Sequence, residues 1–205
     1  AGGAAQLLKR PAVVVTGVCC VLDTLLWAWA EAVVPHVLGS RFGLREAATG
    51  RVEGLVYALY TASLLACGPL VDRLASFKPL LAGCFAAAAA GLCVSTAAVS
   101  LTAYVAGVAV VGLALGSTQA ALLPDMLQGA GTARMAGAAR KAAVYAVTAA
   151  FTFCHLSGGA TGPALGLWLH ARSPALLCGV YGAAMLACAA ALLSAGRGPR
   201  GGPPP

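Results

Sequence analysis

Long apolar runs, separated by short segments that carry most of the polar residues, dominate the pattern along the chain. A helix needs about 20 residues to cross the ~30 Å hydrocarbon layer of a bilayer, and each run is close to that length. The pattern predicts an all-α membrane protein with six transmembrane helices, at about residues 12–34, 54–71, 79–99, 104–123, 142–169 and 175–194.

Charged residues avoid these runs. Hydrophobic residues make up 60% of the chain and charged residues only 9%, a composition that excludes a water-soluble domain. Ionic groups are costly inside hydrocarbon, so their confinement to the connections agrees with membrane insertion. Among acidic, basic and histidine residues, only Asp23, Glu31 and His155 fall well inside a predicted span.

The distribution of Lys and Arg predicts the orientation. If residue 1 is cytoplasmic, nine of the 13 basic residues fall on the cytoplasmic side and four on the other side. This bias favours cytoplasmic termini, in an intracellular vesicle membrane or the plasma membrane. The net charge of +7 then reflects topology and attraction to anionic lipid, and the basic residues are too dispersed to form a nucleic-acid interface.

The two ends of the chain and its cysteines add little chemistry. Residues 1–11 resemble the end of a Gly/Ala-rich cytoplasmic linker, which suggests a fragment of a longer protein, and residues 195–205 form a Gly/Pro tail that we expect to be disordered. All eight cysteines lie in apolar spans, where they serve as small packing residues. No spacing typical of a metal site occurs, and we expect no cofactor.

The first span carries the most unusual polar residues. Asp23, Trp27 and Glu31 are spaced four residues apart, which places two carboxylates and an indole on one stripe of a helix. A carboxylate at membrane depth costs about 2.5 to 3.5 kcal/mol on insertion scales, so it normally faces water, a proton path or a cation. This stripe is therefore a candidate site for cation and proton exchange.

The segment GPLVDRLASFK joins the second and third spans. Gly68, Leu70, Asp72 and Arg73 match the G-x-L-x-D-R loop of the major facilitator superfamily, which this segment resembles. Residues 75–77 depart from the family pattern, and Lys78 is the only basic residue that follows. Asp72 at a helix end can meet a helix N-terminus or an arginine and latch the cytoplasmic face. The alternative is an ordinary acidic and basic pair that solvates a tight loop.

Three further stretches, LLKRPAVVV with the rest of its span, LLPDM, and VYAVTAAFTFCHLSGGATGPALG, resemble the vesicular amine and polyamine transporters over residues 7–194. The resemblance implies the C-terminal six-helix half of a transporter, built from two inverted three-helix repeats, with the N-terminal half as its partner. Spans one, two, four and five would line the pathway. Spans three and six, which contain no charged residue, would face lipid.

The resemblance also implies site residues. It assigns amine binding to Glu31, and it places Gln119 close to a position where the family has a carboxylate. The fifth span likewise lacks the acid that the family has there. Proton coupling would then rely on Asp23, Glu31 and His155, or the substrate is not a classical monoamine.

Simpler roles remain open for each of these residues. Glu31 at the end of its span can extend to the headgroups, Trp27 can belong to an interfacial belt, and His155 can pack against a neighbouring helix. Small residues and a proline in the fifth span indicate close helix packing or a hinge; they are Gly158, Gly162, Pro163 and Gly166.

The sequence thus predicts a transporter half that exchanges protons for an organic cation, such as an amine or polyamine. A permease or exporter for neutral or drug-like solutes is the main alternative, and a non-transporting membrane fragment is another. An intramembrane protease would need a nucleophile motif, and Ser117 and His155 lie in different spans without one. We therefore expect no enzyme activity.

Overall fold

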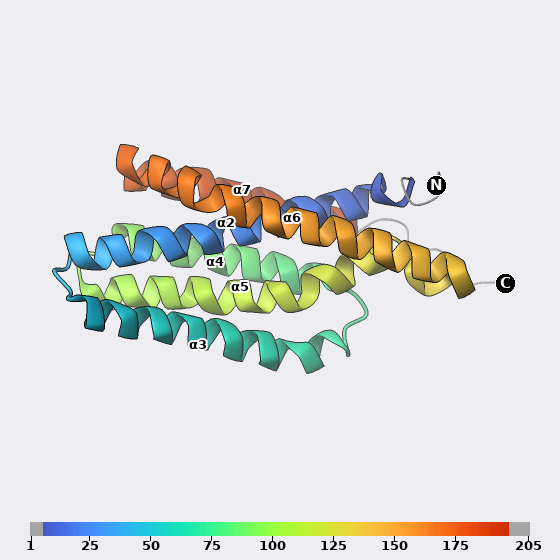
Figure 1. Ribbon diagram of the computed structural model, residues 1–205, viewed down its shortest axis with the longest axis horizontal. Helices are drawn as coiled ribbons and strands as arrows, with labels where there is room; N and C mark the ends of the chain where they lie inside the picture. The colour runs from blue at the N-terminus through green and yellow to red at the C-terminus, as the bar shows by residue number, and fades with distance from the viewer. Residues whose placement is uncertain (1–5, 197–205) are drawn as a thin grey trace.

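The computed structural model describes residues 6–196 as a bundle of six long helices, without a strand in that range (Figure 1). The all-helical prediction is confirmed for this part of the chain. Residues 1–5 of the predicted linker and residues 197–205 of the predicted tail lie outside the described residues. The long helices are α2 (Pro11–Ser40), α3 (Glu46–Val71), α4 (Lys78–Ala97), α5 (Leu101–Gly129), α6 (Gly137–Arg172) and α7 (Pro174–Gly196), and a short 3-10 helix, η1 (Thr132–Arg134), follows α5.

Proline and one serine mark where several helices begin. Pro11 and Pro174 occupy the first residue of α2 and α7, and Lys78 with its following proline opens α4. Proline suits these positions because the first amides of a helix have no partner in the helix anyway. At α5, the Ser100 hydroxyl accepts a hydrogen bond from the amide of Ala103 at 3.2 Å. Local sequence therefore sets these helix starts.

All six helices are long and apolar enough to cross a membrane, so the chain is a multi-pass membrane protein. Each helix extends beyond its predicted span at one or both ends, most clearly α3, which begins at Glu46, and α5, which continues through Pro124 to Gly129. Helix α4 begins at Lys78, one residue before its predicted span, but ends at Ala97, two residues before the end of that span. Proline is tolerated inside a membrane helix when neighbouring groups satisfy the freed carbonyl. Helices and hydrocarbon spans are therefore not the same length.

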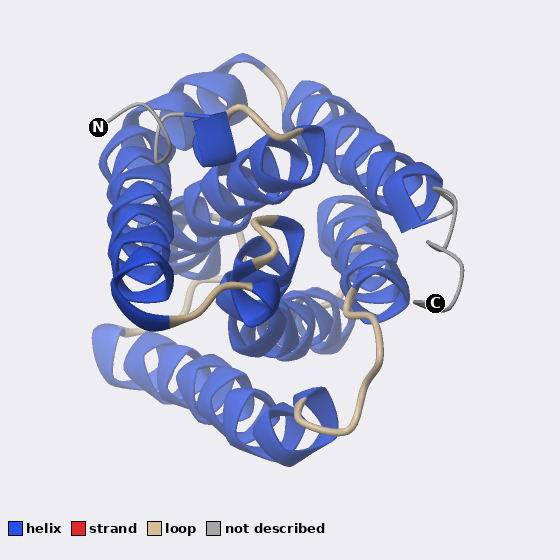
Figure 2. Cartoon of the chain, turned by 90° about the vertical axis from the view of Figure 1, so that its right-hand side faces the viewer, coloured by secondary structure: helices blue, strands red, loops and turns tan. Residues whose placement is uncertain are grey.

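Two helices form the centre of the bundle. In the most apolar stretches of α2 and α5, 56% of the residues are buried, compared with 17% in α3 and in α6. Helix α6 packs on α2, α3 packs on α5, and α4 and α7 pack on each other as well as on the central pair. Figure 2 shows the same bundle along its length, from the end at which α2 begins.

Glycines allow the closest helix contacts. A Cβ on Gly107 of α5 would lie 2.7 Å from the carbonyl oxygen of Gly91 in α4, so only glycine fits this crossing. On α6, Gly158, Gly162 and Gly166 face α2, where a Cβ on Gly162 would lie 2.6 Å from the Leu25 carbonyl oxygen. Small residues drive helix association in membranes in this way.

Candidate functional site

The interface between α2 and α5 carries two reciprocal Thr–Asp contacts. Thr16 and Asp23 are seven residues apart on α2, and Thr118 and Asp125 are seven residues apart on α5. The Thr16 hydroxyl donates to Asp125 at 2.6 Å, and the Thr118 hydroxyl donates to Asp23. All four side chains are at most 1% exposed. The two helices thus exchange the same pair of groups in opposite directions.

Asp23 lies at the end of this interface that has no positive partner. Its two carboxyl oxygens accept hydrogen bonds from Thr118 and from the amide of Gln119, the latter at 2.5 Å. Within residues 6–196, no Lys, Arg or His forms an ion pair with it. A fully buried carboxyl group held only by neutral donors is expensive in its ionised form.

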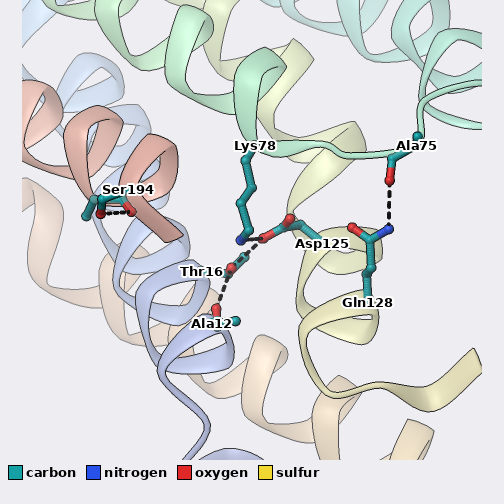
Figure 3. Close-up of polar contacts among 8 residues, drawn as sticks. Ala12, Thr16, Ala75, Lys78, Asp125, Gln128 and Ser194 are labelled. Atoms are coloured by element: carbon teal, nitrogen blue, oxygen red, sulfur yellow. Dashed lines mark hydrogen bonds and ion pairs between the residues drawn. The ribbon is translucent and has the colours of Figure 1, made fainter. Parts of the chain in front are cut away.

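Asp125 lies at the opposite end and has a cation beside it (Figure 3). The ammonium group of Lys78, on the first residue of α4, is 3.3 Å from the same carboxylate oxygen that accepts from Thr16. The Lys78 side chain is 11% exposed. Close by, the Gln128 amide donates to the carbonyl of Ala75 at 3.0 Å, which ties the α3–α4 connection to α5. This cluster joins α2, α4 and α5 at one end of the bundle.

Glu31 occupies a different environment two turns beyond Asp23. It is exposed, and one carboxylate oxygen accepts hydrogen bonds from the Trp27 indole at 2.8 Å and the Tyr57 hydroxyl at 2.7 Å. The Trp27 ring lies against two tyrosines of α3, with centroid distances of 5.1 Å to Tyr57 and 4.3 Å to Tyr60. The other Glu31 oxygen has no hydrogen bond among the described residues, which leaves it available to a ligand.

A second acid, Glu53, borders this aromatic group. Together with Glu31, Trp27 and Tyr57 it lines a hollow of about 20 Å³ between α2 and α3. That volume holds little more than one water molecule. The described residues therefore provide one aromatic and acidic wall, not an enclosed pocket.

The structure brings some predicted site residues together and separates others. Asp23 is bonded to Gln119, and Trp27 is bonded to Glu31. The two acids of the stripe share no ligand group, because one is buried against α5 while the other is exposed beside α3. His155 is also exposed, on α6, where its ring stacks on Phe151 at 6.2 Å and contacts neither acid.

The predicted gate loop lies at the surface of the described bundle. Asp72 and Arg73 are both exposed at the end of α3, and Gly68 is one turn before them. Within residues 6–196, the ion pair at this end of the bundle joins Lys78 to Asp125 instead. Lys78 reaches that carboxylate because it begins α4 and projects back onto α5, whereas Asp72 caps α3 and faces outward.

The sequence prediction missed Asp125, Lys78 and Tyr57. The predicted fourth span ends at residue 123, before Pro124, so Asp125 falls just outside it, although α5 continues past it. A signal for it exists in the sequence: the spacing of Thr16 and Asp23 recurs in Thr118 and Asp125. Nothing in the order of residues indicates that Tyr57 meets Glu31.

Known proteins give no further guide to the chemistry. Neither the models of protein families nor the curated proteins nor the solved structures contain a match to this chain. The function is therefore argued from the geometry.

Proposed function

We propose that this chain forms one six-helix half of a secondary transporter of the major facilitator type, with α2–α4 and α5–α7 as two inverted three-helix repeats. Exchanging α2 with α5, α3 with α6 and α4 with α7 turns the main packing pairs into one another: α2–α6 becomes α5–α3, and α4–α5 becomes α7–α2. An odd number of helix reversals separates α2 from α5, so the repeats have opposite direction across the membrane.

The Thr–Asp contacts support the same proposal at the level of single residues. Thr16 pairs with Asp125 and Thr118 pairs with Asp23, which is the pattern expected when two copies of one helix cross with opposite direction. The beginning of α2 and the end of α7 lie at one end of the bundle, where Arg140 and Lys141 of α6 are exposed. We assign that end to the cytoplasm.

The substrate in this proposal is an organic cation. An exposed carboxylate in a membrane-spanning helix, bordered by the faces and edges of Trp27, Tyr57 and Tyr60, offers both charge and cation–π attraction. Glu31 is the group that meets the cation. This aromatic and acidic wall is the single observation on which the substrate class rests.

Asp23 is the proton-carrying group in this proposal. The Thr118 hydroxyl lies within hydrogen-bond distance of Asp23 and, at 2.7 Å, of the Leu115 carbonyl, yet a hydroxyl has one hydrogen to donate. With Asp23 ionised, two acceptors compete for that hydrogen. With Asp23 protonated, its own O–H donates to Thr118 and both contacts are satisfied.

The Thr16 hydroxyl has the same choice between Asp125 and the Ala12 carbonyl, but there Lys78 neutralises an ionised carboxylate. The lack of such a cation beside Asp23 among the described residues is what favours a protonated Asp23.

The test is uptake by the transporter that contains this chain together with a second half, because alternating access needs both halves. We expect Glu31→Gln to lower uptake of a labelled amine at least about tenfold, since the lost contact with a charged ligand is worth ~1.5 to 3 kcal/mol. Glu46→Gln removes an exposed acid from the first turn of α3 and is the matched control. Both variants are first checked for membrane insertion and thermal stability.

Two results would refute the proposal. The first is amine uptake that persists after a protonophore has collapsed the proton gradient. The second is normal uptake by Glu31→Gln. Saturable flux through the isolated 205 residues would instead show that this chain is not a half, and would leave the substrate class open.

A neutral or drug-like substrate is the second candidate. Gln119 stands near the position at which the resembled family has an acid, and its amide is hydrogen-bonded to Asp23. The chain therefore offers fewer free carboxylates than an amine carrier would use. Competition of labelled uptake by neutral compounds, with no competition by amines, would favour this candidate.

A further inference from the structure

A second cavity lies on the opposite side of α2 from Glu31. It has a volume of about 490 Å³, within the range of small-molecule sites, and lies where α2, α4 and α6 end and α5 and α7 begin. Trp29 of α2 lines it, whereas Trp27, two residues earlier, lines the Glu31 wall. The two sites therefore do not share their side chains.

The polar groups of this cavity are mostly positive or hydrogen-bond donors. Arg41 and His170 line it, and none of the six acidic residues of the chain does. The Arg41 guanidinium donates to the Ala98 carbonyl at 2.5 Å, which holds it in place while its other N–H groups remain for a ligand. The first turn of α7 also lines the cavity, and Ser173 caps it: its hydroxyl accepts from the Leu176 amide at 3.4 Å and its carbonyl accepts from the Leu177 amide at 3.1 Å.

Trp29 forms part of the wall of this cavity. Its side chain is 4% exposed, and its indole nitrogen is buried without a hydrogen-bond partner among the described residues. A buried N–H without an acceptor costs about 1 to 3 kcal/mol. Gly166 of α6 lies against the Cδ1 edge of the ring, next to that nitrogen. A ligand in the cavity would therefore touch carbon atoms of the ring, because the nitrogen has almost no surface open to it.

The remaining wall is apolar. Val33 and Val37 of α2 and Leu177 of α7 also line the cavity. A ligand that fits has a compact head rich in hydrogen-bond acceptors and a short hydrocarbon body.

We propose that this cavity binds the oxyanion head, carboxylate or phosphate, of an amphiphilic organic anion. Arg41 is the charge partner, His170 is the hydrogen-bond donor, and the Trp29 ring forms part of the wall. Two sources share this chemistry: a free organic acid and the headgroup of an anionic lipid. The site is separate from the Glu31 wall, so its test does not depend on the proposed transport function.

Trp29 itself provides the measurement. Trp27→Phe and Trp168→Phe leave it as the only tryptophan of the three in the chain. The 205-residue protein in phosphatidylcholine nanodiscs is titrated with a bromine-labelled undecanoate, which quenches tryptophan on contact, and with the neutral alcohol and the trimethylammonium compound of the same length. We expect saturable quenching by the carboxylate, with at least about tenfold weaker effects of the other two.

Variants then locate the contact. Arg41→Gln should weaken carboxylate binding at least about tenfold, and His170→Gln less, because an imidazole supplies a single hydrogen bond. Arg45→Gln removes an exposed arginine that does not line the cavity and should change nothing. If Arg41→Gln lowers thermal stability, the comparison of carboxylate binding by His170→Gln and by Arg45→Gln decides whether the ligand binds in this cavity.

A change of lipid separates the two sources. If an anionic lipid is the natural occupant, nanodiscs that contain phosphatidylglycerol should compete with the brominated carboxylate, whereas a site for free acids should keep its affinity. Equal quenching by all three compounds, or carboxylate quenching that both Arg41→Gln and His170→Gln leave unchanged, would overturn the proposal.

Discussion

The two ends of the α2–α5 interface use the same Thr–Asp pair, yet their surroundings differ. Asp125 has Lys78 beside it, and one of its oxygens has no partner among the described residues, whereas Asp23 has Gln119 and a complete set of neutral donors. An ion pair holds helices together, while a carboxyl group with neutral donors can gain or lose a proton without breaking a charge contact. One end of the interface is suited to stability and the other to chemistry.

Removing the cation should produce the largest effect. Lys78→Met leaves the buried carboxylate of Asp125 unpaired, and breaking a buried pair in this way costs about 3 kcal/mol. Unfolding of the purified protein in mixed micelles, followed by circular dichroism, measures it. Arg73→Met removes an exposed basic residue from the same end of the bundle and should change the free energy of unfolding by less than about 0.5 kcal/mol.

A double variant shows whether the loss comes from the stranded charge. Adding Asp125→Leu to Lys78→Met removes both charges, and replacing a whole buried pair with apolar groups is often neutral. The double variant should therefore regain most of the lost stability. If the double variant loses as much free energy of unfolding as Lys78→Met and Asp125→Leu lose separately, added together, the pair is not coupled.

Removing the hydroxyls should give a smaller effect that differs between the two ends. Thr118→Val leaves one oxygen of the Asp23 carboxyl group without its hydrogen-bond partner and should cost about 1 to 2 kcal/mol. Thr16→Val should cost less, about 0.5 to 1 kcal/mol, because Lys78 still contacts the same oxygen of Asp125. The same unfolding measurement compares the two, and equal losses would contradict the distinction drawn between the ends.

Neutralising Asp23 should have the smallest effect on stability. Asn keeps a polar group for both Thr118 and Gln119, so the free energy of unfolding should change by less than about 1 kcal/mol. Infrared spectroscopy provides a direct second readout: the C=O stretching band of a neutral carboxyl should disappear in Asp23→Asn and persist in Asp125→Asn. A band that persists in Asp23→Asn would mean that Asp23 is ionised.

The helices were predictable because a spanning helix requires only a sufficiently long run of apolar residues along the chain. A run of about 20 apolar residues is sufficient to indicate a spanning helix, and all six were found. Their ends were less predictable, because a helix continues past the hydrocarbon wherever its polar residues can reach water. Glu46 and Glu53 open α3 in this way, and Pro124 did not end α5.

The candidate site was only partly predictable, for a different reason. The stripe from Asp23 to Glu31 follows from helical periodicity, but its two acids bond to residues on different helices. Gln119 is 96 residues from Asp23, and Tyr57 is 26 residues from Glu31. Which residues those are depends on how α2 crosses α5 and α3. The contact between Lys78 and Asp125 likewise depends on how α4 crosses α5. The sequence of the α3–α4 loop instead suggested Asp72 as the residue that makes a charged contact.

The junction between α6 and α7 gives the bundle a mechanical property. Ser173 alone connects the two helices, so a displacement of one along its axis must also move the other. Helix α6 lies against α2 at three glycines, where Thr24 and Trp29 of α2 fill the space that a Cβ on Gly158 and on Gly166 would take. His170 and Pro174, on either side of the junction, both line the Arg41 cavity. Displacement of α6 along α2 would therefore change the shape of that cavity.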